Sequence, residues 1–177
     1  MRFTQYLTSL RFEFERYKKL GDVTFSQLSE PELYWQPHGD GNSVALIVKH
    51  MVGNMKSRWT NFLTEDGEKP WRHRETEFEQ PPKTKKDIIS LWREGWDCLF
   101  VAIDQVGEHN QDSVIKIRGE DHTLFQAFNR QLAHYAYHVG QIVLIGKMCK
   151  GDDWTSLSIP KGDSETFNQG MFGKNSS

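Results

Sequence analysis

Two histidines four residues apart are the first feature of this sequence with clear chemical potential. His134 and His138 lie in residues 130–142, a stretch with no proline and one glycine, which predicts a helix. On a helix, side chains at positions i and i+4 share a face, with Cβ atoms roughly 6 Å apart. Two imidazoles held in this way can each place a nitrogen about 2.0–2.1 Å from one metal ion. A metal site needs at least one more ligand, which the rest of the chain must supply.

His50 is the best candidate for that third ligand. Asn42 and Ser43 are good helix caps, so we expect a helix from there to about Leu63, with His50 on a polar stripe that borders its apolar side. Helical bundles build metal sites from such side chains on facing helices. The other histidines fall in expected loops or turns, or lie too far from His134. The alternative is that these histidines are ordinary polar residues, hydrogen-bonded at the edge of a core.

Other side chains near the histidines could complete a substrate pocket. On the expected helices they share a face with the histidines or lie beside them, where they could orient an imidazole or hold an anionic group. These candidates are Asn54, Arg130, Gln131, Tyr137 and Gln141. Each of them could equally be an ordinary residue of a helix surface.

A long charged segment, residues 64–83, connects the second expected helix to the third. Connections of this length inside a domain are usually functional or packed by their own side chains. Residues 71–74 could form a lid or a solvated loop, and Arg58 and Trp59 could lie in the pocket or on the surface. No Asp or Glu is expected to point inward near the histidines, so the sequence predicts no general base there.

Composition narrows the classes of partner. The chain has 177 residues, 26% of them charged and 37% hydrophobic, with a net charge of −2 and no basic stripe, so we expect no nucleic-acid partner. No apolar run approaches the roughly 20 residues that span a bilayer. The first residues lack the apolar run of a signal peptide, and Cys98 and Cys149 are expected to be unpaired. We therefore expect a cytoplasmic protein with no membrane partner.

Hydrophobic periodicity predicts an all-α fold. We expect helices over residues 3–20, ended by Gly21, then 43–63, 84–106 and 123–148, with a short turn near Ser26 and at most one short strand over 114–118. Four helices joined by unequal, partly long crossovers predict a four-helix bundle. The bundle is expected to form one domain over residues 1–170. The segment after Gly151 should first wrap the bundle and then fray over residues 171–177.

The face of the last long helix opposite its histidines is made of small residues. Ala133, Ala136 and Gly140 would let another helix approach closely. This face predicts a homodimer with a two-fold axis. The alternative is close packing inside a single chain.

Three segments resemble the DinB-like (YfiT-like) family of metalloproteins. They are Lys49-His50-Met51-Val52-Gly53-Asn54, residues 67–72 and the histidine stretch at 130–142. The resemblance implies a four-helix bundle in non-sequential order, often dimeric, with zinc or nickel on His50, His134 and His138. Characterised relatives include transferases and isomerases that use low-molecular-weight thiols, and others are described as metal-dependent hydrolases.

The expected site leaves positions on the cation open, which is typical of catalytic centres. A metal there could hold a thiolate for transfer to a small electrophile, or lower the pKa of a water for hydrolysis. The sequence contains no thiol-binding motif, but the resemblance implies a thiol transferase acting on small molecules, and this is the function we expect. Metal-dependent hydrolysis, a non-catalytic stress-response module and a purely structural ion are the alternatives.

Overall fold

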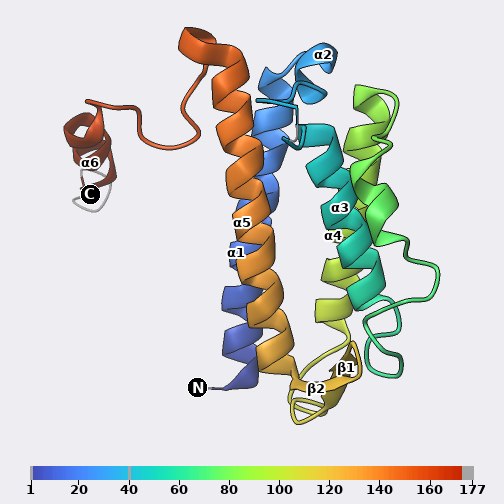
Figure 1. Cartoon of the computed structure of the whole chain (residues 1–177). Coiled ribbons are helices and arrows are strands. Elements are labelled where there is room, and N and C mark those ends of the chain that lie inside the picture. Colours follow the sequence, from blue (N-terminus) through green and yellow to red (C-terminus); the bar gives the residue numbers. More distant parts are fainter. Residues whose placement is uncertain (1, 40, 173–177) are drawn as a thin grey trace.

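The computed structural model describes residues 2–39 and 41–172, most of which lie in helices (Figure 1). In chain order the elements are α1 (Phe3–Gln27), α2 (Glu30–Leu33), α3 (Val44–Trp59), the 3-10 turn η1 (Arg74–Phe78), α4 (Lys85–Asp104), β1 (Val114–Ile117), β2 (Glu120–Thr123), α5 (Leu124–Lys150), the 3-10 turn η2 (Gly151–Asp153) and α6 (Ser164–Phe172). The predicted helical class is confirmed. In this part of the chain, no helix has the length and apolarity needed to span a membrane.

Three helices begin where their capping residues predict. The hydroxyl oxygens of Ser43, Thr84 and Thr123 each accept a hydrogen bond from a backbone N–H in the first turn of α3, α4 and α5. Thr123 also forms a capping box, because the Gln126 side chain reaches back to its backbone N–H. These caps satisfy N–H groups that have no partner within the helix. They also fix the start of α5, and thereby the position of its histidines.

The first helix is longer than predicted, because Gly21 does not end it. α1 continues through Gly21 to Gln27, so the turn expected near Ser26 belongs to this helix, and the short α2 follows it. A Cβ atom on Gly21 would lie 2.4 Å from Cζ2 of Trp92. The glycine thus lets α1 approach α4 closely, and this packing offsets its poor helix propensity.

The long helices α1, α3, α4 and α5 run side by side (Figure 1). α1 packs against α4 and α5, and α3 packs against the same two helices. Their shared core is strongly aromatic, with Phe14, Trp96 and Tyr135 all fully buried. Ring centroids in this group lie 5.9–6.1 Å apart, within the range of favourable aromatic contacts. α3 joins this core as well, because Trp59 donates its Nε1–H to the hydroxyl of Tyr135 on α5 over 3.1 Å.

The predicted strand is one half of a hairpin. β1 pairs with β2 in antiparallel register, from Val114 opposite Thr123 to Ile117 opposite Glu120. The second strand was missed because Glu120–Thr123 is polar and lacks the alternation of a half-buried strand. Arg118 and Gly119 form the turn with φ of 56° and 78°, a conformation that two-residue hairpin turns require.

Asp66 ties the hairpin turn to the crossover between α3 and η1. Its carboxylate accepts hydrogen bonds of 2.8 and 2.7 Å from the backbone N–H groups of Arg118 and Gly119. The crossover is also joined to β1, because Gly67 donates its backbone N–H to the carbonyl of Lys116. Two segments about 50 residues apart in sequence are thus held together at one end of the long helices.

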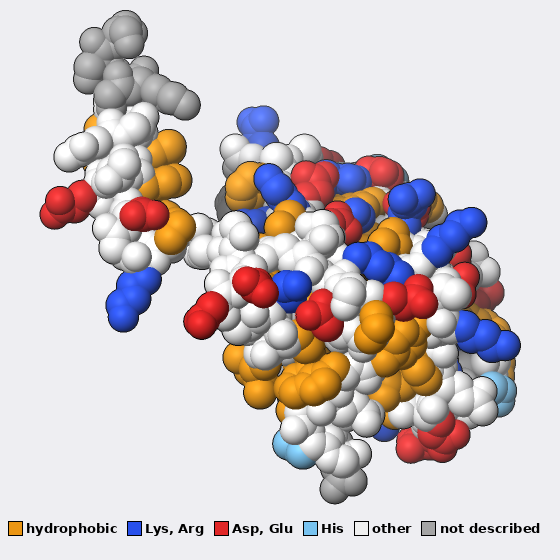
Figure 2. Space-filling model, turned by 90° about the horizontal axis from the view of Figure 1, so that it is seen from above, with side chains coloured by type: hydrophobic (Ala, Val, Ile, Leu, Met, Phe, Trp, Pro, Cys, Tyr) orange, Lys and Arg blue, Asp and Glu red, His pale blue; other side chains and the backbone are white. Residues whose placement is uncertain are grey.

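Only the start of the C-terminal segment lies against the helices. Trp154 lies beside Gly146 of α5, and Gln27 exchanges two hydrogen bonds with the backbone of Thr155. α6 is exposed along its whole length and stands apart from the main body (Figures 1 and 2). Met171, where fraying was predicted to begin, is part of α6, and residues 173–177 of that predicted tail lie outside the described residues. Cys98 and Cys149 are free, as predicted.

The contact at Gly21 predicts an unusual response to alanine. Gly21→Ala should lower the free energy of unfolding by about 1–3 kcal/mol, because the added methyl overlaps Trp92. Gly140→Ala is the matched control, since a Cβ there meets nothing within 4 Å. Alanine at position 140 should be neutral or stabilising by up to about 1 kcal/mol. Urea unfolding of both variants measures this, and equal stabilisation by the two substitutions would contradict the packing argument.

Candidate metal centre

Three histidines from two helices meet at one point. His50 of α3 and His134 and His138 of α5 place one ring nitrogen each within 4.8 Å of one another. The Nε2 atoms of His134 and His138 are 3.0 Å apart. Two nitrogens bound to one cation at about 2.0–2.1 Å have a separation of roughly this size. The donor set therefore fits a divalent cation that prefers imidazole.

A buried carboxylate orients His50. The Nδ1 atom of His50 lies 2.9 Å from Oε2 of Glu77, which comes from η1 in the long crossover. Because an ionised carboxylate only accepts hydrogen bonds, the proton of this imidazole resides on Nδ1 and the lone pair of Nε2 is free. Metal-binding histidines are commonly held this way by a carboxylate.

Arg72 holds Glu77 in place and keeps it ionised. Its Nε donates to Oε1 of Glu77 over 2.8 Å, and its Nη2 donates to Oε2 over 3.0 Å. Burial raises the pKa of Glu77, but the hydrogen bonds from His50 and Arg72 outweigh it and hold that pKa below its ordinary value. The side chains of Arg72 and Glu77 are only 3% and 7% exposed, so water weakens this pair little.

Glu77 corrects the expectation that no acidic residue points toward the histidines. Its position depends on Gly53, one turn beyond His50 on α3, where a Cβ atom would lie 2.1 Å from Oε1 of Glu77. A glycine inside a helix, three residues after a candidate ligand, was a signal in the sequence for such an approach. The crossover therefore supplies part of the site, and residues 71–74 are more than a solvated loop.

The ring of His138 is oriented by a residue of its own helix, α5. Nδ1 of His138 lies 2.8 Å from Oε1 of Gln141, so the amide oxygen accepts the imidazole proton and leaves Nε2 free. This contact gives Gln141 the orienting role considered for it from the sequence. Phe78 of η1 stacks on the His50 ring with centroids 4.8 Å apart. His50 is buried, whereas His134 and His138 are partly exposed.

The surroundings keep His134 and His138 neutral. Burial, together with the nearby His138, His50, Arg72 and Arg58, lowers the pKa of His134 to about 3. Burial also lowers the pKa of His138, against the opposing effect of its hydrogen bond to Gln141. A neutral imidazole is the form that binds a metal, so little proton competition is expected at neutral pH.

A cavity of 220 Å³ opens beside the histidines. His50 and His134 line this cavity and are also two of the three candidate metal ligands. The full lining is His50, Asn54, Arg58, Arg72, Arg74, Arg118, Arg130, Gln131 and His134. A small molecule in this cavity would reach the same side chains that would hold the cation.

Three of the other residues predicted for the pocket line the cavity, and Tyr137 does not. Asn54, Arg130 and Gln131 line it, and Oδ1 of Asn54 accepts a hydrogen bond of 3.1 Å from the hydroxyl of Tyr135. Tyr137 does not line it, because its side chain is 62% exposed on the outside of α5, although its ring lies 4.9 Å from that of His138.

Arg58 and Trp59 lie in different surroundings. Arg58 lines the cavity. Trp59 is 2% exposed, stacks on Phe128 with centroids 4.7 Å apart and donates its Nε1–H to the Tyr135 hydroxyl. Trp59 is therefore a core residue, which corrects the expectation that it lies in the pocket or on the surface.

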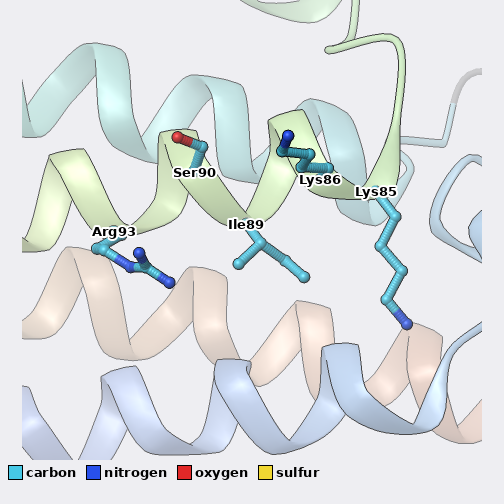
Figure 3. A pocket seen from close by; sticks show the side chains of 5 residues that line it. All are labelled: Lys85, Lys86, Ile89, Ser90 and Arg93. Atoms are coloured by element: carbon cyan, nitrogen blue, oxygen red, sulfur yellow. The ribbon is translucent and has the colours of Figure 1, made fainter.

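A larger hollow of 440 Å³ lies elsewhere, along α4 (Figure 3). Its lining is Lys85, Lys86, Ile89, Ser90 and Arg93, and these side chains spread along the helix rather than converge on a point. None of them is a histidine, cysteine or carboxylate. The smaller cavity beside the histidines is therefore the better candidate for a site of chemistry.

The chain belongs to the family described as Protein of unknown function (DUF1572), which it matches over residues 2–163. No curated protein and no solved structure matches the chain. The family match covers every residue of the histidine cluster and of the adjoining cavity. It ends just before α6, the helix that stands apart from the main body.

The contact between Glu77 and His50 predicts a selective loss of metal affinity. Glu77→Gln should weaken zinc binding by about 10–100-fold, because the carboxylate that fixes the His50 ring is lost. Glu75→Gln is the matched control, since that side chain lies in the same turn and is 86% exposed. Zinc titration against a chromogenic chelator compares the two variants, and thermal unfolding checks that both are folded. Equal affinity in both variants would contradict an orienting role for Glu77.

The depressed histidine pKa values predict how the metal-free protein responds to acid. A histidine whose folded pKa lies below its unfolded value of about 6.5 favours the unfolded state once protonation begins. The titration of His134 and His138 should therefore cost no stability above pH 6.5. As the pH drops toward 5, it should lower the free energy of unfolding. The melting temperature should fall less steeply over this range in His134→Asn than in the wild type. Parallel pH profiles for the two proteins would contradict this assignment.

Proposed function

We propose that His50, His134 and His138 bind one divalent cation, zinc or nickel, and that the protein is a metal-dependent transferase of the DinB-like (YfiT-like) type. In this proposal it joins a low-molecular-weight thiol to a small electrophile. The observation that carries the proposal is the convergence of three imidazole nitrogens beside an accessible cavity. An open set of three nitrogen ligands is typical of catalytic rather than structural metal sites.

The packing of the long helices supports the DinB-like assignment. α1, α3, α4 and α5 would form the four-helix bundle, and its neighbours would not follow chain order, since α1 packs against α4 and α5. The crossovers between α1 and α3 and between α4 and α5 are long enough to permit this order. The match to a family of unknown function neither adds to this assignment nor opposes it.

When bound, the cation would lower the pKa of a thiol and so favour the nucleophilic thiolate. The surrounding side chains orient the imidazoles for this cation. Glu77 and Gln141 hold protons on the Nδ1 atoms of His50 and His138, which directs both Nε2 lone pairs toward the shared point. Phe78 covers one face of the His50 ring and shields it from water. Asn54 lies on the cavity wall with its oxygen engaged by Tyr135, so its amide N–H groups can bind a substrate.

The local acid–base groups favour thiol transfer over hydrolysis. The cavity lining includes no Asp or Glu that could act as a general base for water. Glu77 is close, but its two oxygens are already bound to His50 and Arg72. Thiol transfer depends less on such a base, because a thiol loses its proton far more easily than water does.

A conjugation assay tests this function. The purified protein, loaded with zinc or with nickel, is incubated with cysteine or glutathione and a panel of small electrophiles. Conjugate should form at least 100-fold faster with the wild type than with His50→Ala or His134→Ala, because each variant lacks one ligand. His109→Ala is the matched control, since His109 is exposed and belongs to a turn after α4. Equal rates for the wild type and the two ligand variants, with every metal, would refute the transferase.

Metal analysis and thermal unfolding separate a functional ion from a structural one. His134→Ala should lose the metal yet melt within a few degrees of the metal-loaded wild type, because α3 and α5 are held together by an extensive apolar core. Complete unfolding of this variant would favour a structural ion. The predicted homodimer stays a prediction, although Gly140 has open space beside it in the single chain, as such an interface requires.

A further inference from the structure

We propose that the cavity beside the histidines binds an oxyanion group of the substrate, either a carboxylate or a phosphoryl group. Five arginines line this cavity: Arg58, Arg72, Arg74, Arg118 and Arg130. Guanidinium groups bind carboxylates and phosphates through paired N–H donors. The role of this anion as part of a substrate rests on the proposed function, whereas the binding of an anion does not.

Arg58 is the strongest argument for a missing partner. Its side chain is 4% exposed, and its Nε and Nη1 atoms are buried without a hydrogen-bond partner among the described residues. Burial lowers the pKa of Arg58, and Arg130 and Arg72 add to this effect, whereas Tyr135 and Glu68 oppose it. Buried guanidinium N–H groups without a hydrogen-bond partner are unfavourable, so they are rarely kept in a structure unless something pairs with them. An oxyanion in the cavity would supply that charge.

The crossover makes room for this arginine. A Cβ atom on Gly67 would lie 2.5 Å from Nη1 of Arg58, so only glycine allows the loop to pass so closely. Ser57 holds the loop there, because its hydroxyl donates to the carbonyl of Gly67 over 2.7 Å. The guanidinium therefore occupies a shaped space at the wall of the cavity and is not a displaced surface side chain.

Positive charge at the cavity exceeds the negative charge that pairs with it. Arg72 is paired with Glu77 and Arg118 with Glu68, whose Oε2 lies 2.9 Å from the arginine Nε. Arg74 is exposed and lies 3.5 Å from Oε1 of Glu75.

The two remaining arginines have no carboxylate partner within the described part of the chain. Arg58 has none, and the side chain of Arg130 contacts only Nε2 of His122, at 3.4 Å. Two guanidinium groups that form no ion pair, beside a neutral His134, make the cavity attractive to an anion and unfavourable for a cationic ligand. A divalent cation on the histidines would increase this preference.

The position of the arginines suggests how a substrate would lie. His50 and His134 share the cavity wall with Arg58 and Arg130. One small molecule could therefore place its anionic group on the arginines and its reacting group at the histidines. Fixing both ends would reduce the freedom of the substrate before reaction, which is a major source of rate enhancement. The cavity volume of 220 Å³ limits the ligand to a small metabolite or to one end of a larger molecule.

Anion titrations of the full-length protein as purified test this inference. The probes are inorganic phosphate, malonate and neutral acetamide, with sodium chloride at matched ionic strength as the reference. Phosphate or malonate should raise the melting temperature of the wild type by several degrees, and acetamide should not. Stabilisation by phosphate alone identifies a phosphoryl site, and stabilisation by malonate alone identifies a carboxylate site.

Arginine variants locate the binding. Arg58→Gln and Arg130→Gln should each weaken anion binding at least tenfold. Arg130 is exposed, so its substitution tests the cavity without risk to the core. Arg93→Gln is the matched control, because Arg93 is an exposed cation on α4 outside the cavity, and its anion response should equal that of the wild type. Without an anion, Arg58→Gln should melt at the wild-type temperature or above it, since a buried unpaired charge has been removed.

Two results would overturn the inference. One is stabilisation of the wild type by phosphate and malonate no greater than by sodium chloride at the same ionic strength. The other is equal anion stabilisation in the wild type, Arg58→Gln and Arg130→Gln. Zinc binding is measured on the same samples and should be unchanged in Arg58→Gln. If anions bind but neither metal binding nor conjugation is found, the proposed function fails and the anion site stands.

Discussion

The chain of hydrogen bonds from Arg72 through Glu77 to His50 is the interaction on which the rest of the site depends. It is buried, so each polar group needs its partner, and it joins the crossover to the face of α3. Gly53 makes the contact possible, because any side chain there would collide with Glu77. The same contact directs the free nitrogen of His50 toward the histidines of α5. Without it, the part of the crossover that carries Arg72 and Glu77 would lose this buried contact with α3, and Arg72 would lose its fixed place in the wall of the cavity.

The candidate site combines two electrostatic environments that usually oppose each other. Burial lowers the pKa of His134 and of His138, and neighbouring histidines and arginines lower that of His134 further, so both rings stay neutral, which suits metal binding. The same arginines collect at the cavity with too few carboxylates to balance them, which suits an anionic ligand. In our proposal, an anion on the guanidinium groups would offset the charge of the arginines and of a cation bound to the imidazoles.

The sequence predicted the parts of this protein that depend on local physics. The hydroxyl caps at Ser43, Thr84 and Thr123 correctly located the starts of three helices, because capping needs only residues within one turn. The i, i+4 spacing of His134 and His138 placed two ring nitrogens together for the same reason. The prediction that the first helix ends at Gly21 was wrong, because this glycine is needed for packing against Trp92, which lies on another helix. The second strand was not predicted either, since its polar residues are held in place by a hairpin turn that Asp66 anchors.

The meeting of His50 with the pair on α5 was inferred from helix faces, but only the packing of α3 against α5 decided it. Arg58 and Arg130 were candidates for the pocket, but Glu77 and Arg118 could not be placed in advance, because they come from the crossover and the hairpin turn, whose position over the helices follows from no local pattern. The sequence alone therefore determined the helical class, the helix starts and the identity of the three imidazoles, all of which follow from short-range periodicity and capping. The tertiary structure alone decided how those imidazoles are oriented and which charges face them. Buried hydrogen bonds and charge balance arise only when segments far apart in the chain are brought into contact.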